Sequence, residues 1–250
     1  MKTRRLSKYI VPAFAGLFAT APSGASAAII PGIDLPSDPA SVSNTVTIIL
    51  LITVLSIAPA ILILMTSFTR ILIVLGFVRT AMSTQTMPPT QVLVGLALFM
   101  TLFIMAPTLG EINEKALQPY LQGQMTQTEA MEQAALPMKE FMARQTREKD
   151  LLLFLNYAQA ERPRSVEDIP LSALIPAFAI SELKTAFQMG FMIFVPFLII
   201  DMVVASVLMS MGMMMLPPIM ISLPFKVLLF ILVDGWYLVV RSLLISYNGG

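Results

Sequence analysis

Long stretches without charged side chains constrain the fold of this chain more than any other feature. Val46–Thr66 holds 21 uncharged residues, and the apolar run Phe187–Leu208 is interrupted by one acid. Val92–Pro107 is a shorter apolar stretch, and a last one ends at Ile245. A helix of about 20 apolar residues crosses the hydrocarbon core of a bilayer. The sequence therefore predicts an all-α, membrane-associated protein.

The composition argues against soluble catalysis. Hydrophobic residues make up 56% of the chain and charged residues 12%, about half the charged share of a typical soluble domain. The absence of cysteine and histidine removes disulfides, thiolate nucleophiles, imidazole bases and the usual ligands of zinc and haem. The formal net charge is +1, and nothing indicates nucleic-acid binding. We expect no catalytic residues, no bound metal and no cofactor.

The beginning of the chain has the three parts of a cleavable secretory signal. Residues 1–8 carry four basic side chains and no acid, and residues 9–21 are apolar. Small residues then lead to an Ala-x-Ala cleavage site at Ala25 and Ala27. The alternative, a first membrane anchor, is disfavoured because this apolar stretch has about 13 residues, whereas a span needs about 20. We predict cleavage after residue 27, followed by an irregular exported segment over residues 28–43.

A polar stretch divides the remaining chain into two apolar halves. Residues 108–170 hold 10 acidic and 7 basic side chains, and their composition is typical of helix. We therefore predict two kinked hydrophobic helical hairpins, over residues 44–107 and 172–250. They flank a small polar α-helical domain over residues 108–171.

The signal predicts an orientation for these hairpins. An exported N-terminus places the polar domain on the periplasmic side of an inner membrane and the first turn on the cytoplasmic side. That turn carries Arg70 and Arg79 and no acid, in agreement with the positive-inside rule. We predict that Arg70 and Arg79 anchor this cytoplasmic end.

Two acids lie inside apolar stretches, where a charged carboxylate is costly. Asp201 and Asp234 allow three interpretations: the paired carboxylates of an intramembrane protease, a proton relay, or structural ion pairs. The sequence contexts usual for such proteases are missing. We favour ion pairs with Lys226, Arg241 or another subunit, which would fix the register of the helices. The candidates for buried charges or subunit contacts are Glu182, Lys184, Asp201, Lys226 and Asp234.

A methionine-rich turn lies within the second hairpin, where residues 209–215 contain five methionines. One interpretation is ordinary packing, because methionine fills apolar cores well and the chain has 19 of them. The other is a deformable constriction that yields to a passing chain and holds back ions by dewetting. Composition alone slightly favours ordinary packing.

Several motifs on both sides of the polar domain form a specific set. The first half contains MTSFTRILIVL from Met65 and PPTQVLVGLALF from Pro88. The second half contains ELKTAF from Glu182, PFLIID from Pro196, MMMLPP from Met213, LPFK from Leu223 and VDGW from Val233. Together they resemble the FliP family of flagellar type III export-gate proteins. The resemblance covers about residues 44–107 and 172–246.

The resemblance implies a function and partners. Proteins of this family assemble as about five copies with FliQ-like and FliR-like subunits, alongside further export-apparatus proteins, into a closed helical cone. Unfolded flagellar export substrates pass through its centre. The pore-closing methionine gasket of the family falls on Met213, Met214 and Met215 here, with Met209 and Met211 as weaker candidates. This favours the constriction interpretation of the methionine-rich turn.

The resemblance also implies a geometry that differs from simple hydropathy. Hydropathy predicts four spans, whereas the kinked hairpins of this family lie largely raised out of the bilayer plane, with membrane lipid as a further partner. Pro59, Pro107 and Pro196 fit bent helices of that kind. Virulence secretion systems contain a close relative, but the signal and the polar domain favour flagellar use. A small-solute transporter, the rival class, would need a polar site near broken helices, and no such cluster is apparent.

Overall fold

The computed structural model describes residues 49, 52–53, 56–57, 59–84, 86–213 and 215–248. The chain divides into two compact units, Met1–Leu55 and Ser56–Gly250. In the first unit the structure describes three helical residues, and the Thr53 hydroxyl donates to the carbonyl oxygen of Ile49 at 2.8 Å. The predictions outside the described residues concern the signal, Ala25, Ala27, the segment 28–43 and Met214.

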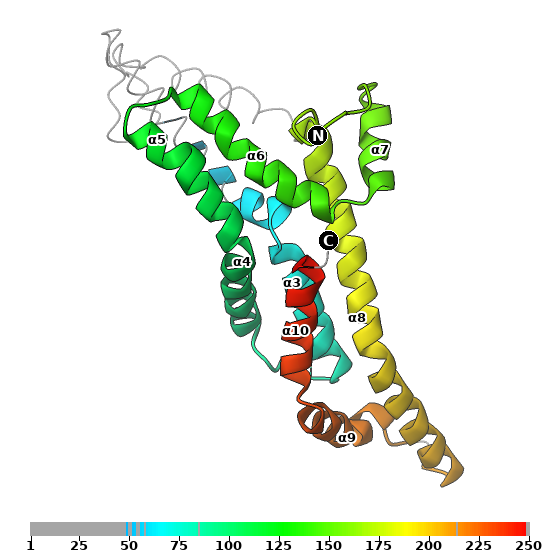
Figure 1. The fold of residues 1–250 in the computed structure, drawn as a ribbon. Helices are drawn as coiled ribbons and strands as arrows, with labels where there is room; N and C mark the ends of the chain where they lie inside the picture. Colours follow the sequence, from blue (N-terminus) through cyan, green and yellow to red (C-terminus); the bar gives the residue numbers. More distant parts are fainter. Residues whose placement is uncertain are drawn as a thin grey trace, which may run out of the picture. The chain divides into compact units, whose positions relative to one another are not determined.

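The described part of the second unit consists of helices joined by turns and by one longer connection, residues 158–170 (Figure 1). In chain order they are α3 (Phe68–Ala81), α4 (Thr90–Ile112), the π-helix η1 (Asn113–Leu117), α5 (Gln118–Leu121), α6 (Gln127–Gln145), α7 (Glu148–Tyr157), α8 (Leu171–Ser210), α9 (Pro218–Leu232) and α10 (Gly235–Asn248). A short helix, Pro59–Met65, precedes α3. The described residues contain no β-strand, and the prediction of an all-α chain is confirmed.

Two helices are long and apolar enough to cross a membrane. One is Thr90–Leu121, which α4, η1 and α5 form together over 32 residues, and the other is α8 with 40 residues. Two further spans result if each of two bent helix pairs is counted as a single span. These pairs are Pro59–Met65 with α3, and α9 with α10. The helix Thr90–Leu121 continues past residue 107, where the first hairpin was predicted to end. That division of the chain stays a prediction.

The bend of 77° before α3 lies at Thr66 and Ser67. Side-chain hydroxyls replace backbone partners there, since Thr66 and Thr69 both donate to carbonyl oxygens of the helix Pro59–Met65. The Thr66 hydroxyl also accepts from the backbone N–H of Phe68 at 3.3 Å. Serine and threonine offer the backbone such alternative partners, so the TSFT sequence is the local cause of this bend.

The second bend, of 62°, separates α9 from α10. Asp234 has a φ of 51°, a left-handed conformation that a regular helix does not contain. Gly235 follows, and a Cβ atom at this position would lie 2.3 Å from the ring of Phe230. The same ring meets Trp236 edge-on, with centroids 5.3 Å apart. The VDGW sequence is therefore a bend that is closed by aromatic packing.

The prolines that were expected to bend helices do not mark these bends. Pro107 and Pro196 lie inside α4 and α8, and both helices continue past them. A proline removes one backbone hydrogen bond, but in an apolar setting the flanking turns keep theirs and the helix persists. The two large changes of direction occur instead at Thr66–Ser67 and at Asp234.

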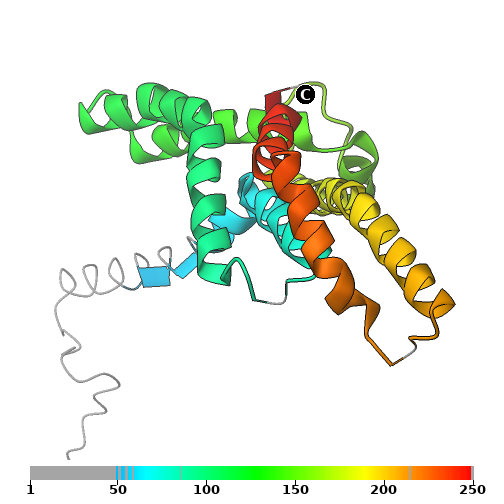
Figure 2. The same ribbon diagram turned by 90° about the horizontal axis from the view of Figure 1, so that it is seen from below.

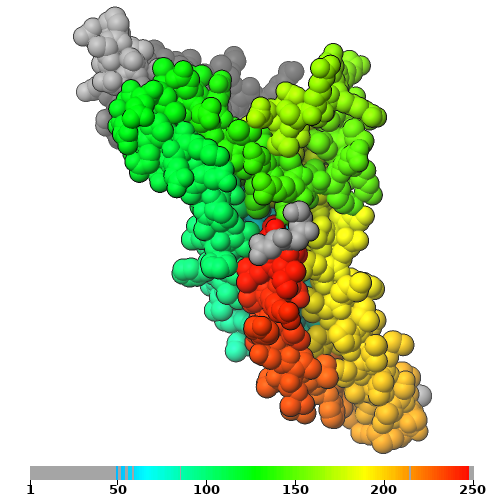
Figure 3. All heavy atoms as spheres, viewed as in Figure 1, coloured from blue at the N-terminus to red at the C-terminus, as the bar shows by residue number. Residues whose placement is uncertain are grey.

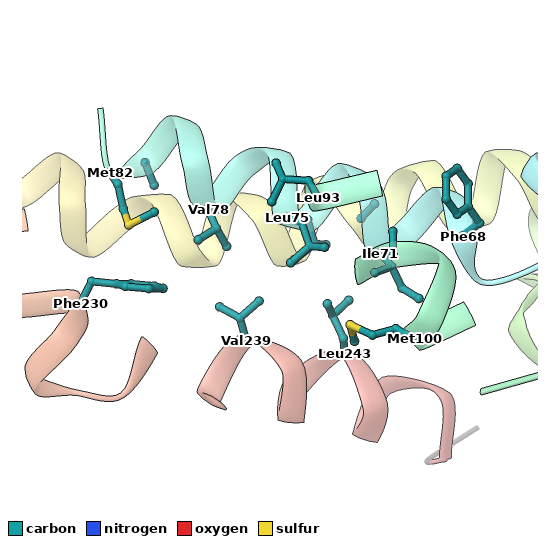
Figure 4. Close-up of a cluster of buried hydrophobic side chains, with 14 of the residues drawn as sticks. Phe68, Ile71, Leu75, Val78, Met82, Leu93, Met100, Phe230, Val239 and Leu243 are labelled. Atoms are coloured by element: carbon teal, nitrogen blue, oxygen red, sulfur yellow. The ribbon is translucent and has the colours of Figure 1, made fainter. Parts of the chain in front are cut away.

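The hydrophobic core lies along α3, whose side chains Ile71 and Leu75 are fully buried. Val239 and Leu243 of α10 point toward them from the opposite side (Figure 4). Two views at right angles place α10 between α4 and α8 (Figures 1 and 2), and the space-filling view shows it filling the surface between them (Figure 3). Helix α3 is thus enclosed by both predicted hairpins, which form one core.

Helix α3 packs tightly against α8 at Gly190. A Cβ atom there would lie 2.3 Å from Cδ2 of Phe77 and 3.0 Å from its Cβ. The Phe77 ring also packs edge-on against Phe187, one turn earlier on α8, with centroids 5.4 Å apart. A larger residue at position 190 would therefore push the two helices apart.

The charged part of the chain packs around the first third of α8. Leu174 and Phe178 of α8 are buried against α6 and the connection that precedes α8. Helix α6 begins with a capping box: the Thr126 hydroxyl accepts from the N–H of Glu129, and the Glu129 carboxylate accepts from the N–H of Thr126 at 2.8 Å. The beginning of α8 therefore belongs to the polar part of the unit, and the rest of α8 extends away from it.

Candidate functional site

The first buried polar network is centred on Arg70 of α3 and Glu182 of α8, whose side chains are 3% and 0% exposed. Nε of Arg70 donates to Oε2 of Glu182 at 2.9 Å, and Nη2 donates to Oε1. Two parallel hydrogen bonds of this kind make a strong and directional pairing of guanidinium with carboxylate. The pair joins the two predicted hairpins inside the unit.

Three polar side chains complete this network. The Tyr247 hydroxyl donates to Oε2 of Glu182 at 2.5 Å, and the Tyr247 ring lies 4.0 Å from the guanidinium carbon of Arg70. Ser246 and Gln145 accept from Arg70 through Oγ and Oε1, at 3.0 and 3.1 Å. The network therefore connects α3, α6, α8 and α10. Its groups satisfy one another, as a charged pair away from water requires.

This placement differs from the anchor role predicted for Arg70 at the cytoplasmic end. The side chain points inward from α3, because the buried carboxylate of Glu182 and the acceptors beside it compensate its charge. Arg79, at the end of α3, donates from Nη1 to the Thr90 hydroxyl at 3.0 Å in an exposed position. Its role as an anchor stays a prediction.

The second buried polar network contains Lys226 of α9, which is 1% exposed. Its Nζ lies 2.6 Å from Oδ2 of Asp201 on α8 and 2.6 Å from the hydroxyl of Ser83, in the turn after α3. The Ser222 hydroxyl donates to Oδ1 of Asp201 at 2.5 Å. Of the partners considered for Asp201, Lys226 is the one with which it pairs in the single chain. The network fixes α8, α9 and the end of α3 against one another.

The other candidates for buried charges are exposed in the single chain. Asp234 lies at the bend between α9 and α10, and Lys184 lies on the outer face of α8. Their roles as subunit contacts stay predictions, since the structure describes one chain.

The methionine-rich turn lies at the far end of the hairpin that α8 and α9 form. Gly212, with a φ of 75°, ends α8: its N–H bonds to the Met209 carbonyl and the Met213 N–H bonds to the Leu208 carbonyl, both at 3.0 Å. Only glycine adopts this conformation without strain. The exposed fractions of the described methionines are 60% for Met209, 59% for Met211, 42% for Met213 and 98% for Met215. Methionine side chains therefore project outward around this tip.

An apolar groove of about 630 Å³ lies between the last half of α8 and α9. The residues that line it are Ile199, Ile200, Val203, Val204, Val207, Leu208, Met211, Ile221, Phe225, Leu228, Leu229 and Leu232. It offers no hydrogen-bonding side chain to a polar solute. Within the described part of the chain, no group of three acidic, histidine or cysteine side chains is placed to hold a metal ion.

These features define an all-helical membrane protein whose apolar helices are connected by buried ion pairs and whose hairpin tip is rich in methionine. The FliP family model matches residues 51–243. The chain belongs to the FliP family.

Several curated proteins are similar to this chain over most of their length. A "Flagellar biosynthetic protein FliP" of Bacillus subtilis is 68% identical over 211 residues, which cover 84% of this chain and 96% of the relative. Proteins of the same name from Pectobacterium carotovorum and Caulobacter vibrioides are 52% and 49% identical, over 87% and 92% of this chain and 86% of each relative.

Sequence reasoning missed several partners in these networks. Ser222 was missed, although it lies four residues before the predicted Lys226 on α9. This spacing places the two residues on one helix face, so a search for polar residues four positions from Lys226 could have found Ser222. Tyr247 and Ser83 gave no such signal, because only the tertiary fold brings the last helix and the turn after α3 to these charges.

Proposed function

We propose that this chain is a structural subunit of the flagellar protein-export apparatus in the bacterial inner membrane. Its membership of the FliP family supports this, and so do the names of its relatives, which are flagellar biosynthetic proteins. These names favour flagellar use over a virulence secretion system. In this proposal the protein does no catalysis, and the energy for transport comes from partners and the proton gradient.

In this proposal about five copies assemble with FliQ-like and FliR-like subunits around a pore for unfolded flagellar substrates. The polar helices α6 and α7 lie on the periplasmic side. Large apolar side chains along α8 and α9 are exposed in the single chain, including Phe191, Met192 and Leu232 at 62–74%. Exposed apolar surface of this extent needs lipid or neighbouring subunits to cover it.

The proposal of a pore rests on the methionine-rich turn. Met215 is 98% exposed at the tip of a hairpin, where ordinary packing within the chain does not hold it. A ring of such tips from several copies would meet at the pore axis. Methionine is unbranched and deformable, so the ring would close around chains of different sequence and exclude ions when empty.

The test is an ion-leak measurement on the assembled export gate in proteoliposomes. Met213, Met214 and Met215 are replaced together by alanine, which shortens the side chains without breaking the turn. We expect a rise in potassium flux over the unaltered gate, because the constriction widens. Met131→Ala, a matched exposed methionine on α6, should leave the flux unchanged. An ion-tight triple variant would show that these residues do not seal a pore.

The transporter alternative predicts a polar solute site within one chain. The groove between α8 and α9 is lined by apolar side chains. The buried charges form two separate ion pairs, Arg70 with Glu182 and Lys226 with Asp201. This distribution supports the export-gate proposal over the transporter.

A further inference from the structure

The surface of α8 changes character near Lys184. Phe178, two turns earlier, is buried in the polar part of the unit, whereas Phe187 and Phe191 are 56% and 62% exposed. From Phe187 to Ile200 the helix has no charged residue. Lys184 is exposed and is the last basic residue before this apolar stretch. A basic side chain in such a position lies at the level of lipid headgroups when the apolar stretch is in a bilayer.

Two more basic side chains lie beside Lys184, at the beginning of α7. Arg147 is fixed against α8, because its backbone N–H donates to the Ser181 hydroxyl at 3.0 Å. Ser181 lies three residues before Lys184 and so on the same side of α8. Lys149 is exposed, and the positive charges of Arg147 and Lys149 both act on Lys184. These three cations form the junction cluster.

The junction cluster has an excess of positive charge and unused donors. Asp150 pairs with Nη2 of Arg147 at 2.5 Å, but Nε and Nη1 of Arg147 are buried without an acceptor among the described residues. The side chain of Arg147 is 28% exposed, so an anion outside can approach its positive charge, although Nε and Nη1 themselves are buried. Glu148, the other acid of this turn, is exposed. The guanidinium charge of Arg147 and the exposed ammonium groups of Lys149 and Lys184 together attract an oxyanion.

We propose that Arg147, Lys149 and Lys184 bind the phosphate of an anionic phospholipid headgroup. The beginning of α7 adds the partial positive charge of a helix N-terminus to the same place. The acyl chains would lie along the exposed apolar surface that begins at Phe187, which favours a lipid over a free phosphate ion. The site is independent of the methionine-rich turn and fixes the depth of the polar helices at the membrane surface.

The proposal can be tested by native mass spectrometry of the full-length protein in neutral detergent, titrated with phosphatidylglycerol or phosphatidylcholine. Lys149→Gln with Lys184→Gln removes two exposed charges. We expect phosphatidylglycerol binding to weaken about 30-fold, since each basic residue near a headgroup contributes about 1 kcal/mol. Phosphatidylcholine adducts should not change. The arginine variants Lys149→Arg and Lys184→Arg should retain binding.

The matched control is Lys115→Gln with Arg162→Gln, which removes two basic charges elsewhere and should leave lipid binding unchanged. Equal weakening in both double variants would mean a general charge effect and would overturn the site. Displacement of phosphatidylglycerol by millimolar inorganic phosphate would assign the cluster to free phosphate instead. If Lys149→Gln with Lys184→Gln abolishes the oligomers seen by native mass spectrometry but leaves phosphatidylglycerol bound, the junction cluster is a contact between copies, and the lipid proposal is overturned.

Discussion

Arg70 is buried beneath apolar helices because each part of its guanidinium has a partner. Glu182→Gln keeps the shape of that partner but removes its charge and leaves the arginine uncompensated. We expect the free energy of unfolding to fall by about 3–5 kcal/mol, as for other buried pairs that lose one member. Chemical unfolding in detergent, followed by circular dichroism, measures this change.

The control for Glu182→Gln is Glu111→Gln, which breaks the exposed pair with Lys115 at 2.9 Å. Exposed pairs contribute little, and we expect no measurable change in unfolding for this variant. Similar effects of the two substitutions would contradict the importance of burial for the Arg70 pair.

Gly190 permits the close approach of α3 to α8 at Phe77. Gly190→Ala places a methyl group against that ring, and we expect a loss of about 1–3 kcal/mol from overpacking. Gly95→Ala on α4 is the matched control, since its added Cβ would meet no atom within 4 Å beyond its chain neighbours and the nearby backbone of its own helix. That control should be neutral or stabilising by up to about 1 kcal/mol, because alanine favours helix. Thermal unfolding that fails to separate the two variants would argue against this crossing.

At the scale of elements, Asp150 connects α7 to α8. Burial raises the pKa of its carboxyl, but the hydrogen bond from Ser181 and the guanidinium of Arg147 lower the pKa by more, and it lies below the ordinary value. An unfolded aspartate has a pKa of about 3.9. The carboxylate therefore stabilises the fold above about pH 4, and this stabilisation is lost as pH falls through the lower pKa of the folded state.

The pH dependence can be checked by urea unfolding of the detergent-solubilised protein between pH 7 and pH 3. Asp150→Asn should reduce stability at pH 7 and flatten its decline below pH 4. Ser181→Ala removes one hydrogen bond to the carboxylate and should move the decline to higher pH. An unchanged profile in both variants would rule out Asp150 as a source of acid sensitivity.

The apolar helices were predictable from sequence because long uncharged stretches have few alternatives in a membrane. The bends were less predictable from sequence. Proline was the expected signal, whereas hydroxyls at Thr66 and Thr69 and the aromatic packing around Gly235 mark the actual changes of direction. The continuation of α4 through η1 also escaped prediction, because a π-helix changes hydrogen bonding without any special residue type.

At the scale of the whole molecule, sequence singled out several charges in apolar stretches but not all their pairings. Asp201 and Lys226 stood out as charges in apolar stretches, and their pairing was among the options considered. Arg70 was assigned to a membrane edge, since local sequence cannot show that Glu182, 112 residues away, lies opposite it. Pairings of this kind follow from the packing of α3 against α8.

Assembly is the prediction that belongs to this scale. The apolar groove between the last half of α8 and α9 should be covered by other copies. Native mass spectrometry of the protein with its export-gate partners should give a discrete oligomer of about five copies. Each copy should lack the 27 residues of the predicted signal. A monomer or dimer in all conditions would contradict the ring and return attention to a transporter.

The length of α8 has a mechanical consequence. The helix is held at Glu182 by the network around Arg70, and 28 residues of the same unbroken helix lead from there to Ser210, in the methionine-rich turn. At a rise of 1.5 Å per residue this lever arm is about 42 Å long. A tilt of about 10° at Glu182 would displace the tip by about 7 Å, roughly the width of an extended polypeptide. In the proposed pore, a small rearrangement among the polar helices would be amplified into a displacement of the methionine-rich turn wide enough to open an aperture.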